Sequence, residues 1–154
     1  MKRTTLATAL IVAFIGSTLG AVDGKKAEYI GGTLTVKEKT EGTLSTQGAT
    51  DVVFEAKGAK VAIQYASITE LEYGQKAGRR VAVAVFVSPL ALFSKKRNHF
   101  LTITFNDSAG KEQAAVFELG KDIVRTTLKV LEVRSGKEVQ YQDEEARKSG
   151  VGGK

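Results

Sequence analysis

The sequence predicts a mainly β protein, a small antiparallel barrel or sandwich of seven to eight strands capped by one C-terminal α-helix. Two observations support this prediction. From residue 28 onward, apolar and polar residues alternate in a series of short segments, which is typical of strands with one buried and one solvated face. After these segments, apolar residues recur at helical spacing near the C-terminus. Such a helix can cover the open end of a curled sheet.

Length and composition fit one domain and exclude several kinds of site. The chain has 154 residues, of which 42% are hydrophobic, and this is enough to form one core. It contains no Cys and one His, which excludes disulfides, thiolate metal sites and multi-histidine metal sites. The formal net charge is +6, and its distribution along the chain is uneven.

The first 20 residues have the pattern of a secretory signal peptide. Two basic residues are followed by an apolar centre at 6–15 and then by small residues. Thr18 and Gly20 fit positions −3 and −1, which predicts cleavage after Gly20 and a secreted or periplasmic protein. The alternative is an uncleaved membrane anchor, because the uncharged stretch 4–22 is close to the ~20 residues that span a bilayer.

Seven short alternating segments precede the predicted helix. Gly-containing links at 57–59 and 107–110 have the length that antiparallel hairpins need. Gly31 and Gly32 lie within the first segment, where they predict a β-bulge or close backbone packing. In chain order, the segments are 30–36, 43–46, 52–56, 61–65, 71–73, 101–105 and 115–119.

The segment Val81–Val87 differs from the others because it is apolar on both faces. Its β-branched residues favour a strand, which ends at Ser88–Pro89. A strand that is apolar on both faces is usually covered on both. We therefore expect it to lie between the core and a second covering layer.

One amphipathic helix is predicted near the C-terminus. Val124, Leu128 and Leu131 recur at positions i, i+4 and i+7, so they share one face of a helix. Asp122 lies in the expected first turn, where the helix dipole favours an acid. Gly136 follows Ser135 and is expected to end the helix in the left-handed conformation.

The order of strands and helix, together with the sequence VAIQYASITELEYGQ at 61–75, resembles bacterial pleckstrin-homology-like domains, which include GRAM-like domains. In this family a strand, a short Tyr-x-x-Ile turn and a further strand follow one another. Tyr65, Ile68 and Leu71 occupy these places here. The sequence SPLALFSKKRNHFLTITF at 88–105 is also similar to a group of uncharacterised secreted bacterial proteins with this layout.

The resemblance covers residues 28–136 and implies a β-barrel with a C-terminal helix, preceded by the signal peptide and followed by a flexible polar tail at 142–154. Residues 137–141 are expected to add one extended piece before the tail. Pleckstrin-homology folds bind phosphoinositides or peptides, and some have no known ligand, so the resemblance does not assign a function. Because the signal peptide directs the chain out of the cytoplasm, phosphoinositides are not the expected ligand.

The sequence carries weak signals for catalysis. His99 is expected at the end of a strand, at the rim of the barrel, and a catalytic role would require a carboxylate such as Glu112 or Glu118 within hydrogen-bond reach. No G-x-S-x-G elbow and no phosphate-binding loop is present. Glu70 and Glu72 supply two carboxylates, fewer than the six or more oxygen ligands of Ca²⁺, so we expect a solvated strand face. We predict no catalytic residue, no metal site and no cofactor.

The segment 76–97 combines basic and apolar residues and contains no acid, which makes it the candidate binding site. Cations that attract anionic headgroups and side chains that insert into a membrane act together in peripheral membrane binding. The alternative is structural, in which the basic residues keep a hydrophobic hairpin soluble. The basic residues are Lys76, Arg79, Arg80, Lys95, Lys96 and Arg97, and the apolar docking residues are Leu90, Leu92 and Phe93.

These observations predict a non-enzymatic binding module for an anionic membrane surface or an envelope protein. Two alternatives remain open: a structural or assembly subunit of the cell envelope that docks through edge strands, and a small hydrolase-type enzyme that uses His99. Nucleic acid is not an expected partner, because the basic cluster lacks interleaved Tyr or Trp residues. The sequence does not determine the oligomeric state.

Overall fold

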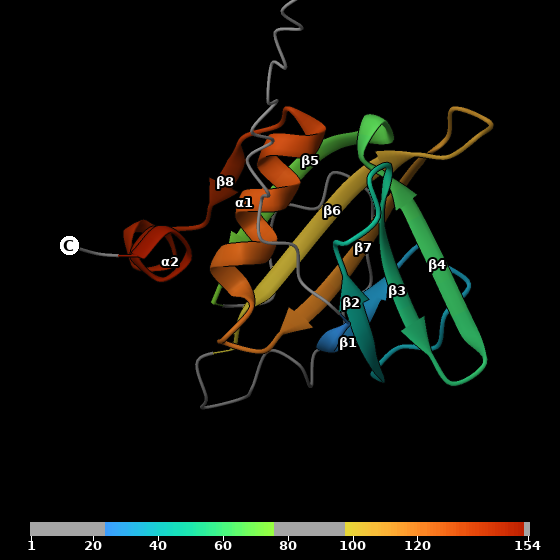
Figure 1. The fold of residues 1–154 in the computed structure, drawn as a ribbon, viewed down its shortest axis with the longest axis horizontal. Coiled ribbons are helices and arrows are strands. Elements are labelled where there is room, and N and C mark those ends of the chain that lie inside the picture. The colour runs from blue at the N-terminus through green and yellow to red at the C-terminus, as the bar shows by residue number, and fades with distance from the viewer. Residues whose placement is uncertain (1–23, 76–97, 153–154) are drawn as a thin grey trace, which may run out of the picture.

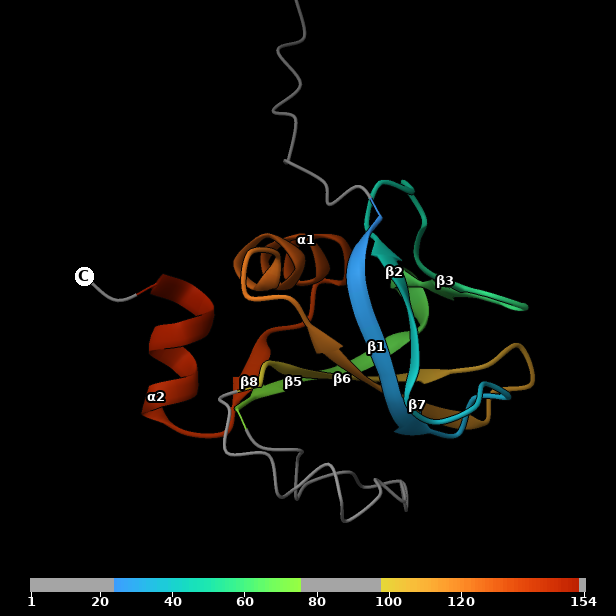
Figure 2. The same ribbon diagram turned by 90° about the horizontal axis from the view of Figure 1, so that it is seen from below.

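The strands of the computed structural model form one curled sheet, and the structure describes residues 24–75 and 98–152 (Figure 1). The eight strands follow the order β4-β3-β2-β1-β7-β6-β5-β8. Every neighbouring pair is antiparallel except β5 and β8, which are parallel. The sheet curls into a half-barrel, with α1 on its concave side (Figure 2). The predicted mainly β fold with a C-terminal helix is therefore confirmed.

The elements lie close to the segments predicted from alternation and helical spacing. In chain order they are β1 (Lys25–Gly32), β2 (Thr40–Ser45), β3 (Asp51–Ala56), β4 (Ala59–Gln64), a 3₁₀ turn (Tyr65–Ser67), β5 (Ile68–Gly74), β6 (Phe100–Asn106), β7 (Glu112–Leu119), α1 (Val124–Ser135), β8 (Val139–Tyr141), α2 (Glu144–Arg147) and a π-helical turn (Lys148–Gly152).

The pairing of β1 with β7 joins the two halves of the sheet. Its register shifts between Tyr29 and Gly31, so a bulge lies where the sequence predicts one. At Gly32 the backbone has φ +145°, and a Cβ atom there would lie 2.2 Å from the carbonyl oxygen of Ala114. Both the bulge and the close backbone packing predicted for this glycine pair are confirmed.

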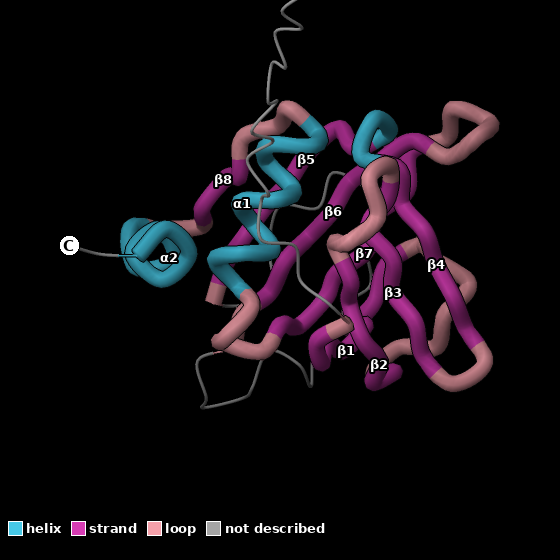
Figure 3. Tube along the Cα trace, viewed as in Figure 1, coloured by secondary structure: helices cyan, strands magenta, loops and turns pink. Residues whose placement is uncertain are grey.

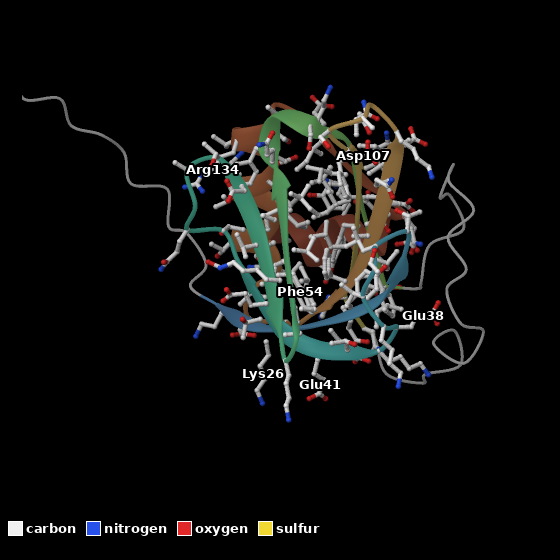
Figure 4. The ribbon with its side chains drawn as sticks, turned by 90° about the vertical axis from the view of Figure 1, so that its right-hand side faces the viewer. Lys26, Glu38, Glu41, Phe54, Asp107 and Arg134 are labelled. Atoms are coloured by element: carbon white, nitrogen blue, oxygen red, sulfur yellow. The ribbon has the colours of Figure 1, made fainter. Side chains whose placement is uncertain are left out.

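The core fills the concave side of the sheet. Three aromatic rings lie at its centre, with the ring centroid of Phe54 5.2 Å from that of Phe117 and 6.4 Å from that of Tyr29. Figure 4 shows Phe54 among the side chains that fill the space between β3–β4 and β6–β7. Because Tyr29, Phe54 and Phe117 come from three strands, their packing holds both halves of the sheet together.

Helix α1 packs its predicted apolar face on the core and ends at the predicted glycine. Val124, Leu128 and Leu131 are buried, and Gly136 has φ +69°. Near its C-terminal end, Arg134 reaches the connection between β2 and β3. The Arg134 Nη1 atom donates to the carbonyl oxygens of Thr46, at 2.6 Å, and Gly48, and its guanidinium lies 5.3 Å from the centre of the Tyr65 ring.

Three expectations about element boundaries need correction. Asp122 is predicted in the first turn of the helix, but α1 begins at Val124 with Ile123 as its N-cap, so no acidic residue lies in that turn. The first strand ends at Gly32, and residues 33–39 form a connection whose Leu34 and Val36 still pack on the core. The region 142–154 was expected to be a flexible tail, but α2 forms within it. The Asp143 carboxylate caps this helix by accepting a hydrogen bond from the Ala146 amide, and Ala146 is completely buried.

Candidate functional site

All nine residues predicted for the binding site lie outside the described residues. They are Lys76, Arg79, Arg80, Leu90, Leu92, Phe93, Lys95, Lys96 and Arg97. The apolar segment Val81–Val87 and the predicted signal peptide at 1–20 lie outside them as well. The structure therefore shows the residues to which segment 76–97 is attached, and not the segment itself.

The attachment of this segment is defined by the register of β5 and β6. Gly74, the last residue of β5, pairs with Phe100, the first residue of β6. Both ends of segment 76–97 therefore join the sheet at one place. Residues 75–99 connect these two paired strand ends along the chain.

His99 lies at this attachment point, directly before β6. Its Nδ1 atom is 2.6 Å from the hydroxyl oxygen of Tyr73, and the two rings stack at an interplanar angle of 11°. The Tyr73 hydroxyl lies 3.2 Å from the hydroxyl of Ser149, and the His99 carbonyl accepts the amide hydrogen of Leu119. His99 is only 9% exposed, so the expected strand-end position is confirmed but the residue is buried.

Burial and a neighbouring charge both lower the pKa of His99. Desolvation lowers the pKa of His99 below its ordinary value, and the nearby Lys121 ammonium lowers it further. The neutral imidazole is thus the favoured form, and the Tyr73 hydroxyl donates to Nδ1 in the tautomer that leaves this nitrogen unprotonated. The network orders the strand end and the C-terminal turn that carries Ser149.

The two carboxylates predicted as partners of a catalytic His99 are not hydrogen-bonded to it. Glu112 pairs with Asn106, at the opposite end of β6 from His99. Glu118 accepts a hydrogen bond of 3.2 Å from the Asn98 side chain. Among the described residues, the hydrogen bonds recorded for the His99 side chain involve Tyr73 and neither of these glutamates. Neither Glu112 nor Glu118 therefore supports the enzyme hypothesis.

A row of carboxylates crosses three strands near the same end of the sheet. Glu28 of β1 pairs with Glu41 of β2 on one side and with Glu118 of β7 on the other. Burial, with a contribution from Glu28, raises the pKa of Glu118. These residues help to line a surface hollow of about 450 Å³. Sequence patterns missed this row because its members are far apart in the chain and no local pattern marks them.

The two acidic residues on β5 are more buried than predicted. Glu70 is half-buried and Glu72 is 8% exposed, so the expected solvated strand face is wrong for Glu72. Within the described ranges, no group of three or more Asp, Glu and His side chains is arranged to hold a metal ion. In the same ranges, no helix is long and apolar enough to cross a membrane.

Comparisons with known proteins add no name to this geometry. No family model matches the chain, and no curated protein matches it. The resemblance to pleckstrin-homology-like domains therefore stays a prediction.

Proposed function

We propose that this protein is a non-enzymatic binding module that works outside the cytoplasm and docks on an anionic membrane surface through segment 76–97. One observation carries the proposal: Gly74 pairs with Phe100, so both ends of this basic and apolar segment start from one end of the sheet. The paired strands β5 and β6 therefore give the segment a fixed attachment on the domain. The signal-peptide pattern at 1–20 supports the compartment.

The charge distribution supports the same proposal. Segment 76–97 contains six basic residues and no acidic residue, whereas the described residues contain 14 basic and 16 acidic residues. Positive charge is therefore concentrated in the segment and is not a general property of the domain. Lys121, which lies close enough to His99 to lower the pKa of its imidazole, adds a cation beside the attachment point.

The expected energies are sufficient for reversible binding when the two signals act together. Each cation near an anionic surface contributes about 1 kcal/mol, and salt screens this contribution within a Debye length. Three cations are thus expected to change the affinity by on the order of 100-fold. Leu90, Leu92 and Phe93 supply apolar surface, and the insertion of this surface into the membrane is not screened by salt.

Cosedimentation with lipid vesicles tests the proposal. We expect the protein to bind vesicles that contain phosphatidylglycerol, to bind them less in high salt, and not to bind pure phosphatidylcholine vesicles. Replacing Lys95, Lys96 and Arg97 by Ala should weaken binding by on the order of 100-fold. A loss of binding that is confined to serine variants of Leu90, Leu92 and Phe93 would instead show that apolar insertion, and not the basic residues, holds the protein on the vesicle.

A charge-matched variant provides the control. Lys57, Lys111 and Lys137 are exposed and come from three other places on the domain, so their replacement by Ala removes the same net charge. If the two triple variants weaken vesicle binding equally, binding depends on net charge and the proposed site is wrong. If neither the protein nor the variants bind anionic vesicles at low salt, the proposed function itself is wrong.

A further inference from the structure

Strand β4 forms one edge of the sheet. In the strand order it is the terminal strand, and among the described residues it pairs with β3 alone. Figure 1 shows β4 on the outside of the molecule, and Figure 3 shows α1 and α2 gathered at the other edge, next to β8. Among the described residues, no strand pairs with the outer side of β4, so its outward backbone groups can form the edge of a further pairing.

The register of the β3–β4 hairpin identifies these backbone groups. Ala56 pairs with Ala59 across a two-residue turn, so this closing pair exchanges hydrogen bonds, and such pairs recur at every second residue. The Tyr65 amide donates to the carbonyl oxygen of Thr50 at 2.9 Å, which continues the same alternation. The residues between these pairs, Lys60, Ala62 and Gln64, direct their amide and carbonyl groups away from β3.

This edge has few of the features that usually prevent strand pairing. Edge strands are commonly protected by Pro, by bulges, by short length or by charged side chains, often Lys. Strand β4 has six residues and no Pro, and its register with β3 is regular along its whole length. Its one charged residue, Lys60, is paired with Glu55 at 2.6 Å between Nζ and Oε1. The opposite edge strand, β8, has only three residues.

We propose that β4 pairs with β4 of a second copy of this chain, antiparallel and about a two-fold axis through Ala62. In this register Ala62 faces Ala62 of the second copy, and Lys60 faces Gln64 of the second copy. The amide and carbonyl of Ala62 pair with those of Ala62 in the second copy, and the Gln64 amide donates to the Lys60 carbonyl of the second copy. The register thus gives two hydrogen bonds at its centre and one on each side. The pairing continues the sheet from one copy into the other.

Side-chain chemistry favours a second copy as the occupant. The register sets no two like charges opposite one another, because Lys60 faces an uncharged amide. On the inner face, Val61 is half-buried and would face Ile63 of the second copy, which adds apolar contact. The Gln64 carbonyl is already used within the chain, because Gln64 is the N-cap of the 3₁₀ turn and its carbonyl also accepts a hydrogen bond of 2.8 Å from the Ser67 hydroxyl. At position 64 the outward amide therefore makes the contact with the second copy.

Sedimentation velocity on the protein expressed from the full sequence tests this proposal. We expect a monomer–dimer equilibrium over about 1 µM to 1 mM, the range in which small interfaces associate. Gln64→Glu places a carboxylate opposite the Lys60 ammonium of the second copy, and should tighten the dimer about fivefold. Gln64→Lys places two like charges opposite one another, and should weaken it about fivefold.

Ala62→Pro provides a separate test at the two-fold axis. The Ala62 amide points outward and has no partner on β3, so proline removes no bond within the monomer but removes the central pair of the dimer. We expect no dimer for this variant, with far-UV circular dichroism and the thermal midpoint checking that it folds. If this variant does not fold, the opposite shifts of the two Gln64 variants, whose side chains are exposed, still decide the matter.

Three results would overturn the proposal. The first is a protein that stays monomeric at every concentration. The second is a dimer whose affinity changes in the same direction, or does not change, in the two Gln64 variants, because this places position 64 away from a charge of the second copy. The third is a folded Ala62→Pro variant that dimerises like the unmodified protein, because this places the interface elsewhere. None of these results depends on vesicle binding.

Discussion

At the scale of single residues, His99 illustrates how the surroundings of a side chain decide its chemistry. In the sequence it is the single group that titrates near neutral pH, which makes it a natural candidate for acid–base chemistry. In the structure it is buried against Tyr73. Burial is the larger cause that lowers the pKa of its imidazole, and the Lys121 ammonium is the smaller one. A neutral, hydrogen-bonded imidazole at this place orders the chain and contributes to stability in a pH-dependent way.

We expect the free energy of unfolding to fall as the pH decreases from about 7 to about 5. The unfolded chain binds a proton at His99 near pH 6.5, whereas the folded protein binds this proton less readily because its pKa is lower. The stabilisation is therefore complete above the unfolded pKa and is lost as the pH falls toward the folded pKa. Urea unfolding of the protein and of a His99→Asn variant over this range measures the effect.

The difference in the free energy of unfolding between the protein and the His99→Asn variant separates the contribution of His99 from that of other titrating residues. The raised pKa of Glu118, caused by burial and by Glu28, acts in the opposite direction at lower pH, but it is present in both proteins. The advantage of the unmodified protein over the variant should shrink as the pH falls. An advantage that is constant with pH would contradict the assigned direction.

At the scale of elements, Arg134 attaches α1 to the first half of the sheet. Its Nη1 atom donates to Thr46 at 2.6 Å, to Gly48, and to the Tyr65 hydroxyl at 3.2 Å. The helix comes from the end of the chain, whereas these acceptors come from the β2–β3 connection and the 3₁₀ turn. One side chain thus links three elements that are distant in sequence.

Replacing Arg134 by Ala should lower the free energy of unfolding by about 2 kcal/mol, because hydrogen bonds from a charged donor contribute about 1.5–3 kcal/mol and their acceptors lose a partner. Chemical denaturation measures this change. Arg125→Ala is the matched control, since Arg125 is exposed on the same helix, and surface changes of this kind stay within about 0.5 kcal/mol. Equal losses in the two variants would show that Arg134 does not fasten the helix.

At the scale of the whole molecule, the pairing of β1 with β7 holds the sheet together. Within residues 24–75 and 98–152, strands β1–β4 pair only among themselves except at this junction, and so do β5–β8. The junction joins residues about 90 positions apart in the sequence, as in the pair Ala27 and Leu119. Because the core lies across it, separation of the two halves would expose the aromatic residues of both.

Gly32→Ala should therefore destabilise the whole domain, by at least about 2 kcal/mol. The added Cβ atom would lie 2.2 Å from the Ala114 carbonyl oxygen on β7, and the backbone there has φ +145°. Gly58→Ala is the control, because Gly58 has φ +81° but nothing within 4 Å of the added atom, so only the backbone strain of about 1 kcal/mol remains. Thermal unfolding of both variants measures the difference, and a larger loss for Gly58→Ala would contradict this account.

The sequence was informative about the candidate site and uninformative about its surroundings. The basic and apolar content of 76–97 is visible in one contiguous stretch, so inspection of the chain finds it. The attachment at Gly74 and Phe100, the buried network of His99 with Tyr73 and Ser149, and the carboxylates of Glu28, Glu41 and Glu118 each depend on contacts between distant strands. No local pattern marks such contacts.

By itself, the sequence determined most of the strands, the face of α1 that packs on the core, its end at Gly136 and the bulge before Gly32. These features follow from period-two and helical spacing and from the backbone freedom of glycine, which act over a few residues. The tertiary structure decided the strand order, the burial of His99 and Glu72, the ordered helix at 144–147 and the edge position of β4. The physical reason is that hydrogen bonding and burial across a sheet depend on which strands become neighbours, and this is a property of the whole chain.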